Sequence, residues 1–242
     1  MAGDYDGDGL MDAAVYRPST GTWFLLFSAS GYTTYMAVNW GLNTDIPVVA
    51  DLDGDRRSDL VVYRPSSGTW FALLSSTGYD PGAYRYWTWG ASTDVPIAGD
   101  FDGDGLADIT VYRPSNGTWW SLLSSTNYNL GAFRYWTWGG GSAQAVPGDY
   151  DGDGVTDIAV YYPSTGTWYA LLSSTDFTSF LYWTWGLSGD VPIVGDFDGD
   201  GKADITVYRP SNGTWYSLVS GFGYSFQYWA WGISGNIPVP KP

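Results

Sequence analysis

The sequence contains neither cysteine nor histidine. Without these residues the chain can form no disulfide, no thiol nucleophile, no histidine-type zinc site and no Ser-His-Asp or Cys-His catalytic group. Most common catalytic constellations are therefore excluded, and we expect a protein that is not an enzyme.

Glutamate is also absent, because all 25 acidic residues are aspartate. Glutamate favours helices and aspartate does not, so this composition favours an all-β fold. Only 10 residues are lysine or arginine and the formal net charge is −15, which argues against nucleic acid as a partner and favours cations.

Long apolar runs are missing as well. No run of 18 apolar residues occurs, and the opening MAGDYDGDG has neither the charged nor the apolar region of a signal peptide. We therefore expect no membrane span and no signal peptide within this chain.

Apolar and aromatic residues are abundant, at 44% and 19% of the chain, which is enough for a folded core. An aspartate-rich nonapeptide recurs at intervals of 47 or 49 residues, beginning at Asp4, Asp51, Asp100, Asp149 and Asp196. Five repeats of this length predict a single domain, residues 1–242, with one propeller blade per repeat.

Each repeat predicts four short strands. In the second repeat these are Ile46–Ala50, Leu60–Arg64, Thr69–Ser75 and Tyr84–Trp89, with a tight turn at residues 65–68. Apolar groups occur on both faces of most strands, as expected when blades stack face to face. The sequence therefore predicts an all-β, five-bladed β-propeller of four-stranded antiparallel blades.

The two ends of the chain resemble two halves of one strand. The final GNIPVPKP supplies the beginning of a first strand and the opening MAGD supplies its end. We predict that pairing of the N- and C-terminal segments closes the propeller, with Ile237 and Val239 buried. The competing architecture is an open solenoid, which would need polar terminal caps.

The nonapeptides predict five metal sites. Carboxylates at positions 1, 3, 5 and 9 would repel one another strongly without a cation, and hard oxygen ligands suit Ca²⁺ better than Mg²⁺. The alternative is a set of Asp-Gly turns held by local hydrogen bonds. The predicted carboxylate ligands are Asp4, Asp6, Asp8, Asp12, Asp51, Asp53, Asp55, Asp59, Asp100, Asp102, Asp104, Asp108, Asp149, Asp151, Asp153, Asp157, Asp196, Asp198, Asp200 and Asp204.

A backbone carbonyl at position 7 would complete each site, from Leu10, Arg57, Leu106, Val155 and Lys202. An EF-hand is excluded, because its loop needs a glutamate at position 12, where this sequence has only valine.

DxDGDGxxD followed by a VYRP strand resembles the FG-GAP, or VCBS-type, repeat family, whose Ca²⁺ loops occupy β-propellers such as the integrin α-chain head. The resemblance covers all five repeats and implies about five structural Ca²⁺ ions. One departure is Arg56, which replaces the glycine found at position 6 of the other four loops.

A YWTWG motif ends most repeats, and its second tryptophan is a candidate ligand-binding residue. Such a residue either packs between blades or stacks on a sugar ring. The candidates are Trp40, Trp89, Trp138, Trp185 and Trp231. The arginines of the YRP motif, with Tyr162 in the fourth repeat, are expected to stack on a ring or pair with a carboxylate; anion binding is the alternative.

The leading interpretation is a non-enzymatic Ca²⁺-binding module for binding or adhesion, secreted and monomeric. Carbohydrate is the expected ligand class, because the family resemblance implies a type of propeller of which several members are lectins. The alternative is a structural or protein-interaction scaffold, which would be either an idealised repeat protein or a fragment of a larger secreted protein. A third hypothesis is a lyase or hydrolase, although no acid-base pair is identifiable.

Overall fold

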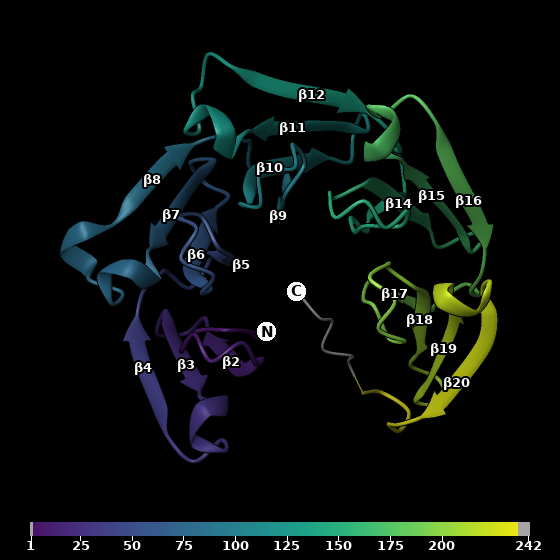
Figure 1. The fold of residues 1–242 in the computed structure, drawn as a ribbon, viewed down its shortest axis with the longest axis horizontal. Coiled ribbons are helices and arrows are strands. Elements are labelled where there is room, and N and C mark those ends of the chain that lie inside the picture. The colour runs from purple at the N-terminus through teal and green to yellow at the C-terminus, as the bar shows by residue number, and fades with distance from the viewer. Residues whose placement is uncertain (1, 237–242) are drawn as a thin grey trace. The chain divides into compact units, whose positions relative to one another are not determined.

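Short strands are the main regular secondary structure of the chain. A computed structural model describes residues 2–236, and these contain twenty strands in five antiparallel sheets, each of four strands in sequence order (Figure 1). The strands are β1 (Ala2–Gly3), β2 (Asp12–Arg17), β3 (Thr22–Leu26) and β4 (Tyr35–Asn39); β5 (Ile46–Ala50), β6 (Asp59–Arg64), β7 (Thr69–Leu73) and β8 (Arg85–Thr88); β9 (Val95–Gly99), β10 (Asp108–Arg113), β11 (Thr118–Leu122) and β12 (Phe133–Thr137); β13 (Gln144–Ala145), β14 (Ile158–Tyr162), β15 (Thr167–Leu171) and β16 (Phe180–Thr184); and β17 (Val191–Ile193), β18 (Ile205–Arg209), β19 (Thr214–Val219) and β20 (Ser225–Ala230).

A single turn of 3-10 helix follows the third strand of every sheet. The third strand of the second repeat therefore ends at Leu73 rather than at the predicted Ser75, because Ser75 begins such a turn. An aromatic residue at positive φ follows each turn, and Tyr79, at 60°, is one example. The 3-10 helices are η1 (Ser28–Ser30), η2 (Ser75–Thr77), η3 (Pro81–Ala83), η4 (Ser124–Thr126), η5 (Ser173–Thr175) and η6 (Ser220–Phe222).

The sheets are apolar on both faces, as the strand pattern predicts. In β7 and the residue that follows it, Trp70, Ala72 and Leu74 belong to one apolar cluster, which also contains residues of β10. The alternate residues Phe71 and Leu73 belong to a second cluster, together with Trp23 of β3. Alternation along one strand therefore supplies the core on both sides of the sheet.

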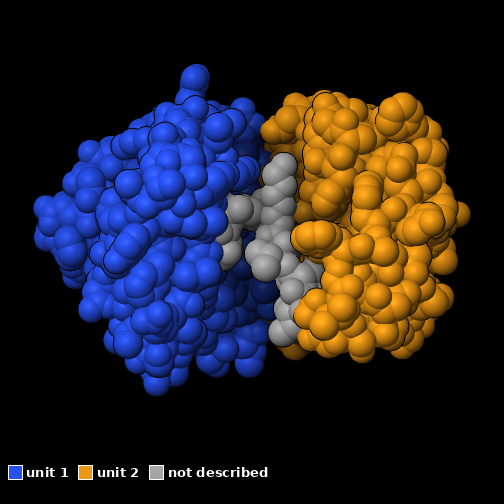
Figure 2. Space-filling model, turned by 90° about the horizontal axis from the view of Figure 1, so that it is seen from below, with its two compact units in different colours: residues 1–112, 120–135, 242 blue, residues 113–119, 136–241 orange. Residues whose placement is uncertain are grey.

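The chain separates into two compact units, which Figure 2 shows in two colours. Among the described residues, one unit comprises residues 2–112 and 120–135, and the other comprises residues 113–119 and 136–236. The apolar cluster around Trp70 lies in the first unit, and a third cluster, around Trp168, lies in the second. Each unit thus has a core of its own, and the prediction of a single domain remains a prediction.

The predicted closure of the ends involves residues 237–242, which lie outside the described part of the chain. Within that part, the two-residue β1 pairs with β2. The first blade therefore has three full-length strands and the short β1. No pairing between the N- and C-terminal segments is seen among the described residues, and closure remains a prediction.

Buried tyrosine hydroxyls connect consecutive repeats in the first unit. Tyr79 is 6% exposed, and its hydroxyl donates to the carbonyl oxygens of Tyr5, at 3.0 Å, and Ser58, at 2.9 Å. Tyr128 makes the same two contacts one repeat later, with Leu52 and Ala107. One phenol thus holds the loops of two repeats together.

We expect Tyr79→Phe to lower the free energy of unfolding by about 1–3 kcal/mol, because the buried carbonyls would lose their donor. Chemical denaturation monitored by tryptophan fluorescence measures this difference. Tyr32→Phe is the matched control: Tyr32 holds the equivalent position in the first repeat, but is 52% exposed and donates to the Met11 carbonyl on the surface. Equal losses in the two variants would contradict this role for Tyr79.

Candidate metal centre

The aspartate nonapeptide of each repeat forms the loop between the first and second strands of its blade. The carboxylate at position 1 organises the backbone of this loop. In the third repeat, Asp100 Oδ1 accepts from the N–H of Gly103 at 2.6 Å, and Oδ2 accepts from the N–H of Gly105 at 2.8 Å. The same two bonds recur in the other four loops, so the loop curls around its first carboxylate.

The carboxylate at position 9 is the buried one. Asp59 is 0% exposed; its Oδ2 accepts from the Leu52 N–H at 2.8 Å, and its Oδ1 accepts from the Ser75 N–H at 2.8 Å. Burial raises the pKa of Asp59 and of Asp108 to about 7, and that of Asp157 to about 6, against the lowering effect of these hydrogen bonds. A nearby cation would stabilise the charged form of each group.

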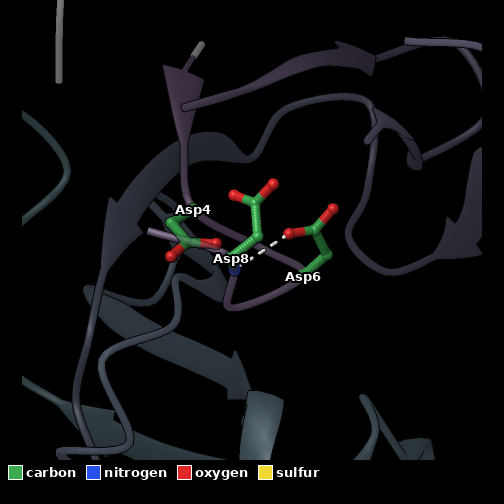
Figure 3. A group of neighbouring side chains, drawn as sticks. All are labelled: Asp4, Asp6 and Asp8. Atoms are coloured by element: carbon green, nitrogen blue, oxygen red, sulfur yellow. Dashed lines mark hydrogen bonds between the residues drawn. The ribbon is translucent and has the colours of Figure 1, made fainter. Parts of the chain in front are cut away.

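Three carboxylates converge in every loop. In repeats two to five, the aspartates at positions 1, 3 and 9 each offer an oxygen, and the three oxygens lie within 4.8 Å of one another. In the first repeat the group is Asp4, Asp6 and Asp8 (Figure 3). The convergence of like charges gives five groups, one per blade, that could hold a metal ion.

The position 5 aspartates of repeats two to five lie outside these groups. Asp104 Oδ1 instead accepts from the N–H of Leu106 at 2.9 Å and from the Ser124 hydroxyl at 2.9 Å. In the first repeat it is the position 9 residue, Asp12, that lies outside the group. The ligand set at positions 1, 3, 5, 7 and 9 remains a prediction, and three of its carboxylates converge in each loop.

One atom of the third loop bears directly on the fit of a cation. Asp102 Oδ1 is buried and has no hydrogen-bond partner, although it belongs to the converging group. A buried carboxylate oxygen without a partner is costly, and a hard cation would satisfy it. The residues present therefore fit a bound metal ion.

A family model described as the FG-GAP-like repeat matches residues 100–160 and 149–207 of this chain. Residues 100–207 therefore carry FG-GAP-like repeats. With five sheets and one aspartate group in each, the fold of the chain is a five-bladed β-propeller. No curated protein matches it in sequence.

Solved structures share this fold. A lectin from Agrocybe aegerita that specifically recognises non-reducing terminal N-acetylglucosamine matches with a TM-score of 0.59 and 16% identity, over 94% of this chain and 64% of the lectin chain. A catalytically inactive virginiamycin B lyase from Staphylococcus aureus with quinupristin matches with a TM-score of 0.53 and 8% identity, over 95% of this chain and 74% of the lyase. This chain thus spans less than two thirds of the lectin.

No helix in residues 2–236 is long and apolar enough to cross a membrane.

Serine hydroxyls that the sequence analysis did not single out also contact the loops. The hydroxyl of Ser75 donates to Asp55 at 2.8 Å, and that of Ser76 donates to Asp53. The only signal for them is the Ser-Ser pair that follows the third strand in repeats two to four. These contacts bind the carboxylates to the 3-10 turn of the same repeat.

The candidate tryptophans use their indole N–H groups to join consecutive blades. Trp89 donates to the carbonyl of Trp120 at 3.1 Å, and Trp138 donates to that of Tyr169 at 3.3 Å. Trp40 and Trp185 make the same bond to their following blades. Trp231, in contrast, is 81% exposed. The bonded tryptophans therefore have a packing role, whatever else their rings contact.

Two of the YRP arginines, Arg64 and Arg209, make both of the ordinary contacts that the sequence predicts. The Arg64 guanidinium forms two hydrogen bonds with Asp45, at 2.9 and 2.8 Å, and lies 4.4 Å from the centre of the Phe71 ring. Arg209 pairs with Asp190 in the same way and lies over Tyr216. Asp45 also accepts from the backbone N–H of Leu42, which fixes the turn before β5.

Arg56 adopts the left-handed conformation that its position demands. Its φ is 67°, and the glycines at the same position of the other loops have φ between 84° and 90°. A residue with a Cβ atom is strained in this region by about 1–2 kcal/mol, whereas glycine is not.

We expect Arg56→Gly to raise the free energy of unfolding in EDTA by about 0.5–1 kcal/mol. The release of about 1–2 kcal/mol of strain is partly offset by the greater entropy of an unfolded glycine, about 0.4–1 kcal/mol. Chemical denaturation provides the measurement. Arg56→Gln removes the charge but keeps the strain, so it should not reproduce the gain.

Gly105→Ala provides the reverse test, because a Cβ at Gly105, where φ is 88°, would meet no atom within 4 Å. This variant should lose stability through backbone strain alone. A destabilising Arg56→Gly, or a neutral Gly105→Ala, would contradict the account of this position.

Proposed function

We propose that the five aspartate groups bind Ca²⁺ and that the bound ions stabilise the propeller. The proposal is supported chiefly by the buried, unpartnered Asp102 Oδ1 within a group of three converging carboxylates. Ca²⁺ accepts six to eight oxygen ligands in flexible geometry, whereas Mg²⁺ needs a smaller octahedral shell. Five Ca²⁺ ions would bring the formal net charge from −15 to −5.

Removal of Ca²⁺ should destabilise the protein. A ligand that binds only the folded state at 100 times its dissociation constant contributes about 2.7 kcal/mol per site. We therefore expect a melting temperature several degrees lower in EDTA than in millimolar Ca²⁺, with Mg²⁺ as the ionic control. Equal melting temperatures in EDTA and Ca²⁺ would refute a structural role for the ion.

The variant Asp102→Asn separates metal binding from general charge effects. In EDTA it should not destabilise, because it removes one of several repelling charges; in Ca²⁺ it should lower both the number of ions bound and the melting temperature. Asp80→Asn is the matched control, since Asp80 lies outside the loops and only caps the 3-10 turn η3. Identical behaviour of these two variants in Ca²⁺ would count against metal binding at Asp102.

We further propose that the chain is a non-enzymatic binding module whose ligand class is carbohydrate. The observation that supports it is a set of aromatic side chains open to solvent on the outermost strands. Tyr86, Tyr135 and Tyr182 are 62%, 61% and 65% exposed. Exposed ring faces suit the apolar face of a sugar, and the fold likeness to an N-acetylglucosamine-specific lectin points the same way. Extracellular modules bind Ca²⁺ with dissociation constants of about 10⁻⁴–10⁻³ M, and we propose an extracellular location on this analogy. We also propose that the protein is a monomer.

A glycan array in millimolar Ca²⁺ tests the ligand class. We expect reproducible binding to a small group of glycans, lost when EDTA unfolds or loosens the blades. The absence of binding to any glycan on the array would refute carbohydrate binding and favour the alternative, a structural or protein-interaction scaffold. The virginiamycin B lyase shares only the fold, and its activity supplies no second candidate.

A further inference from the structure

The fourth repeat lacks an ion pair that other repeats possess. In the second repeat Arg64 pairs with Asp45, and in the fifth Arg209 pairs with Asp190. The fourth repeat has Tyr162 at the arginine position and Ala143 at the aspartate position. The backbone turn is nevertheless retained: the Ala143 N–H donates to the Gly140 carbonyl just as the Asp45 N–H donates to that of Leu42.

Both partners of the pair are thus replaced within one repeat. Loss of one partner alone would leave a partly buried charge without its counter-ion, which is strongly destabilising. The double change leaves no such charge. It also removes the guanidinium that lies over Phe24, Phe71 or Tyr216 in the first, second and fifth repeats.

A cavity of about 440 Å³ lies at this place, and we refer to it as the fourth-blade pocket. Trp138, Tyr162 and Tyr169 line it together with Thr165 and Thr167. Its counterpart in the second repeat is lined by Trp40, Arg64 and Phe71, and also by Pro81 and Tyr84, and has only about 240 Å³. Small-molecule sites usually have about 300–1,000 Å³, a range that only the larger of these two pockets reaches.

The walls of the fourth-blade pocket combine aromatic rings with hydroxyl groups. The ring of Tyr169 meets those of Tyr162, at 6.0 Å and 89°, and Trp138, at 6.4 Å and 80°. The Thr167 hydroxyl donates to the Thr165 hydroxyl at 2.9 Å, a pair that keeps acceptor capacity for a ligand. This combination of ring faces and hydroxyls suits a molecule with one apolar face and several hydroxyl groups.

The charge of the pocket restricts the ligand further. Every residue that lines it is neutral, and the protein carries a formal net charge of −15. An anionic ligand would find no arginine here and would meet a repulsive field. The chemistry therefore favours a neutral ligand.

We propose that the fourth-blade pocket is a saccharide subsite that binds one neutral pyranose ring per chain, stacked on an aromatic wall and hydrogen-bonded by Thr165, Thr167 and Tyr162. The assignment rests on the proposed carbohydrate-binding function and narrows it from a repeated site to a single specialised one. The loss of the ion pair in this repeat leaves the wall of the pocket without a charged group.

Isothermal titration in millimolar Ca²⁺ tests the assignment, with N-acetylglucosamine, galactose and mannose as neutral probes and glucuronic acid as the anionic probe. We expect at least one neutral sugar to bind with a stoichiometry of one, and glucuronic acid to bind at least tenfold more weakly. Stronger binding of glucuronic acid, or a stoichiometry near five, would overturn the assignment to this pocket.

The double variant Ala143→Asp/Tyr162→Arg removes the Tyr162 ring from the pocket and restores at its wall the ion pair that the second and fifth repeats already tolerate. It should weaken binding at least tenfold without lowering the melting temperature in Ca²⁺. Asp45→Ala/Arg64→Tyr, the opposite exchange in the second repeat, is the matched control and should leave the original site unchanged. Undiminished binding by Ala143→Asp/Tyr162→Arg would refute the pocket.

Thr167→Val provides a second test that does not depend on the folding of the double variant. Valine keeps the branched shape of threonine and removes only the hydroxyl, so binding should weaken at least fivefold with little change in stability. An unaltered affinity would count against the pocket. If a glycan array detects binding that none of these substitutions alters, the protein binds carbohydrate but not at the fourth-blade pocket. If no sugar binds the unmodified protein, the carbohydrate proposal and the subsite proposal both fail.

Discussion

The structure of each blade depends on the hydrogen bonds that the buried aspartate at position 9 of its loop accepts. The two oxygens of this aspartate accept from two segments that are far apart in the repeat. In the third repeat, Asp108 binds the N–H of Phe101 at the start of the loop and the N–H of Ser124 after the third strand. One carboxylate thus fixes the loop to the end of β11. Since burial raises its pKa to about 7, its charge is costly, and the converging carboxylates at positions 1 and 3 increase that cost. A bound cation would relieve both effects at once.

Much of this arrangement could be predicted from the sequence because the repeats sample the same local physics five times. The β5 strand has the predicted bounds, Ile46–Ala50, and the alternation of Trp70 with Phe71 gives the two-sided core. Left-handed geometry at Arg56 was also predictable, since glycine fills that position in the other loops. Local patterns of this kind need no knowledge of distant contacts.

Other features depend on contacts between segments far apart in the chain, which a pattern cannot specify. The hydroxyl of Tyr79 reaches the carbonyl of Tyr5, 74 residues away, and nothing in the local sequence distinguishes that role from simple packing. Ser75 likewise reads as a strand residue, although its hydroxyl bonds to Asp55 in the loop. For Trp138 the sequence left packing and ligand binding as alternatives, but its indole N–H bonds to Tyr169 while its ring lines a pocket. The two roles are compatible, since the hydrogen bond uses only the indole N–H on one edge of the ring.

Repetition and function place different demands on such a chain. Positions that pack or organise a loop tend to be repeated from blade to blade, and the Arg64–Asp45 pair recurs as Arg209–Asp190. A binding site for an asymmetric ligand gains from a sequence change in one repeat that does not disturb the packing of the blades. Tyr162 and Ala143 satisfy that condition, because together they replace the arginine and the aspartate of the ion pair and so leave no unpaired buried charge. A single substitution at either position would have carried the cost of an unpaired ion, so the paired change marks the fourth repeat as the place where the symmetry could be broken with the least loss of stability.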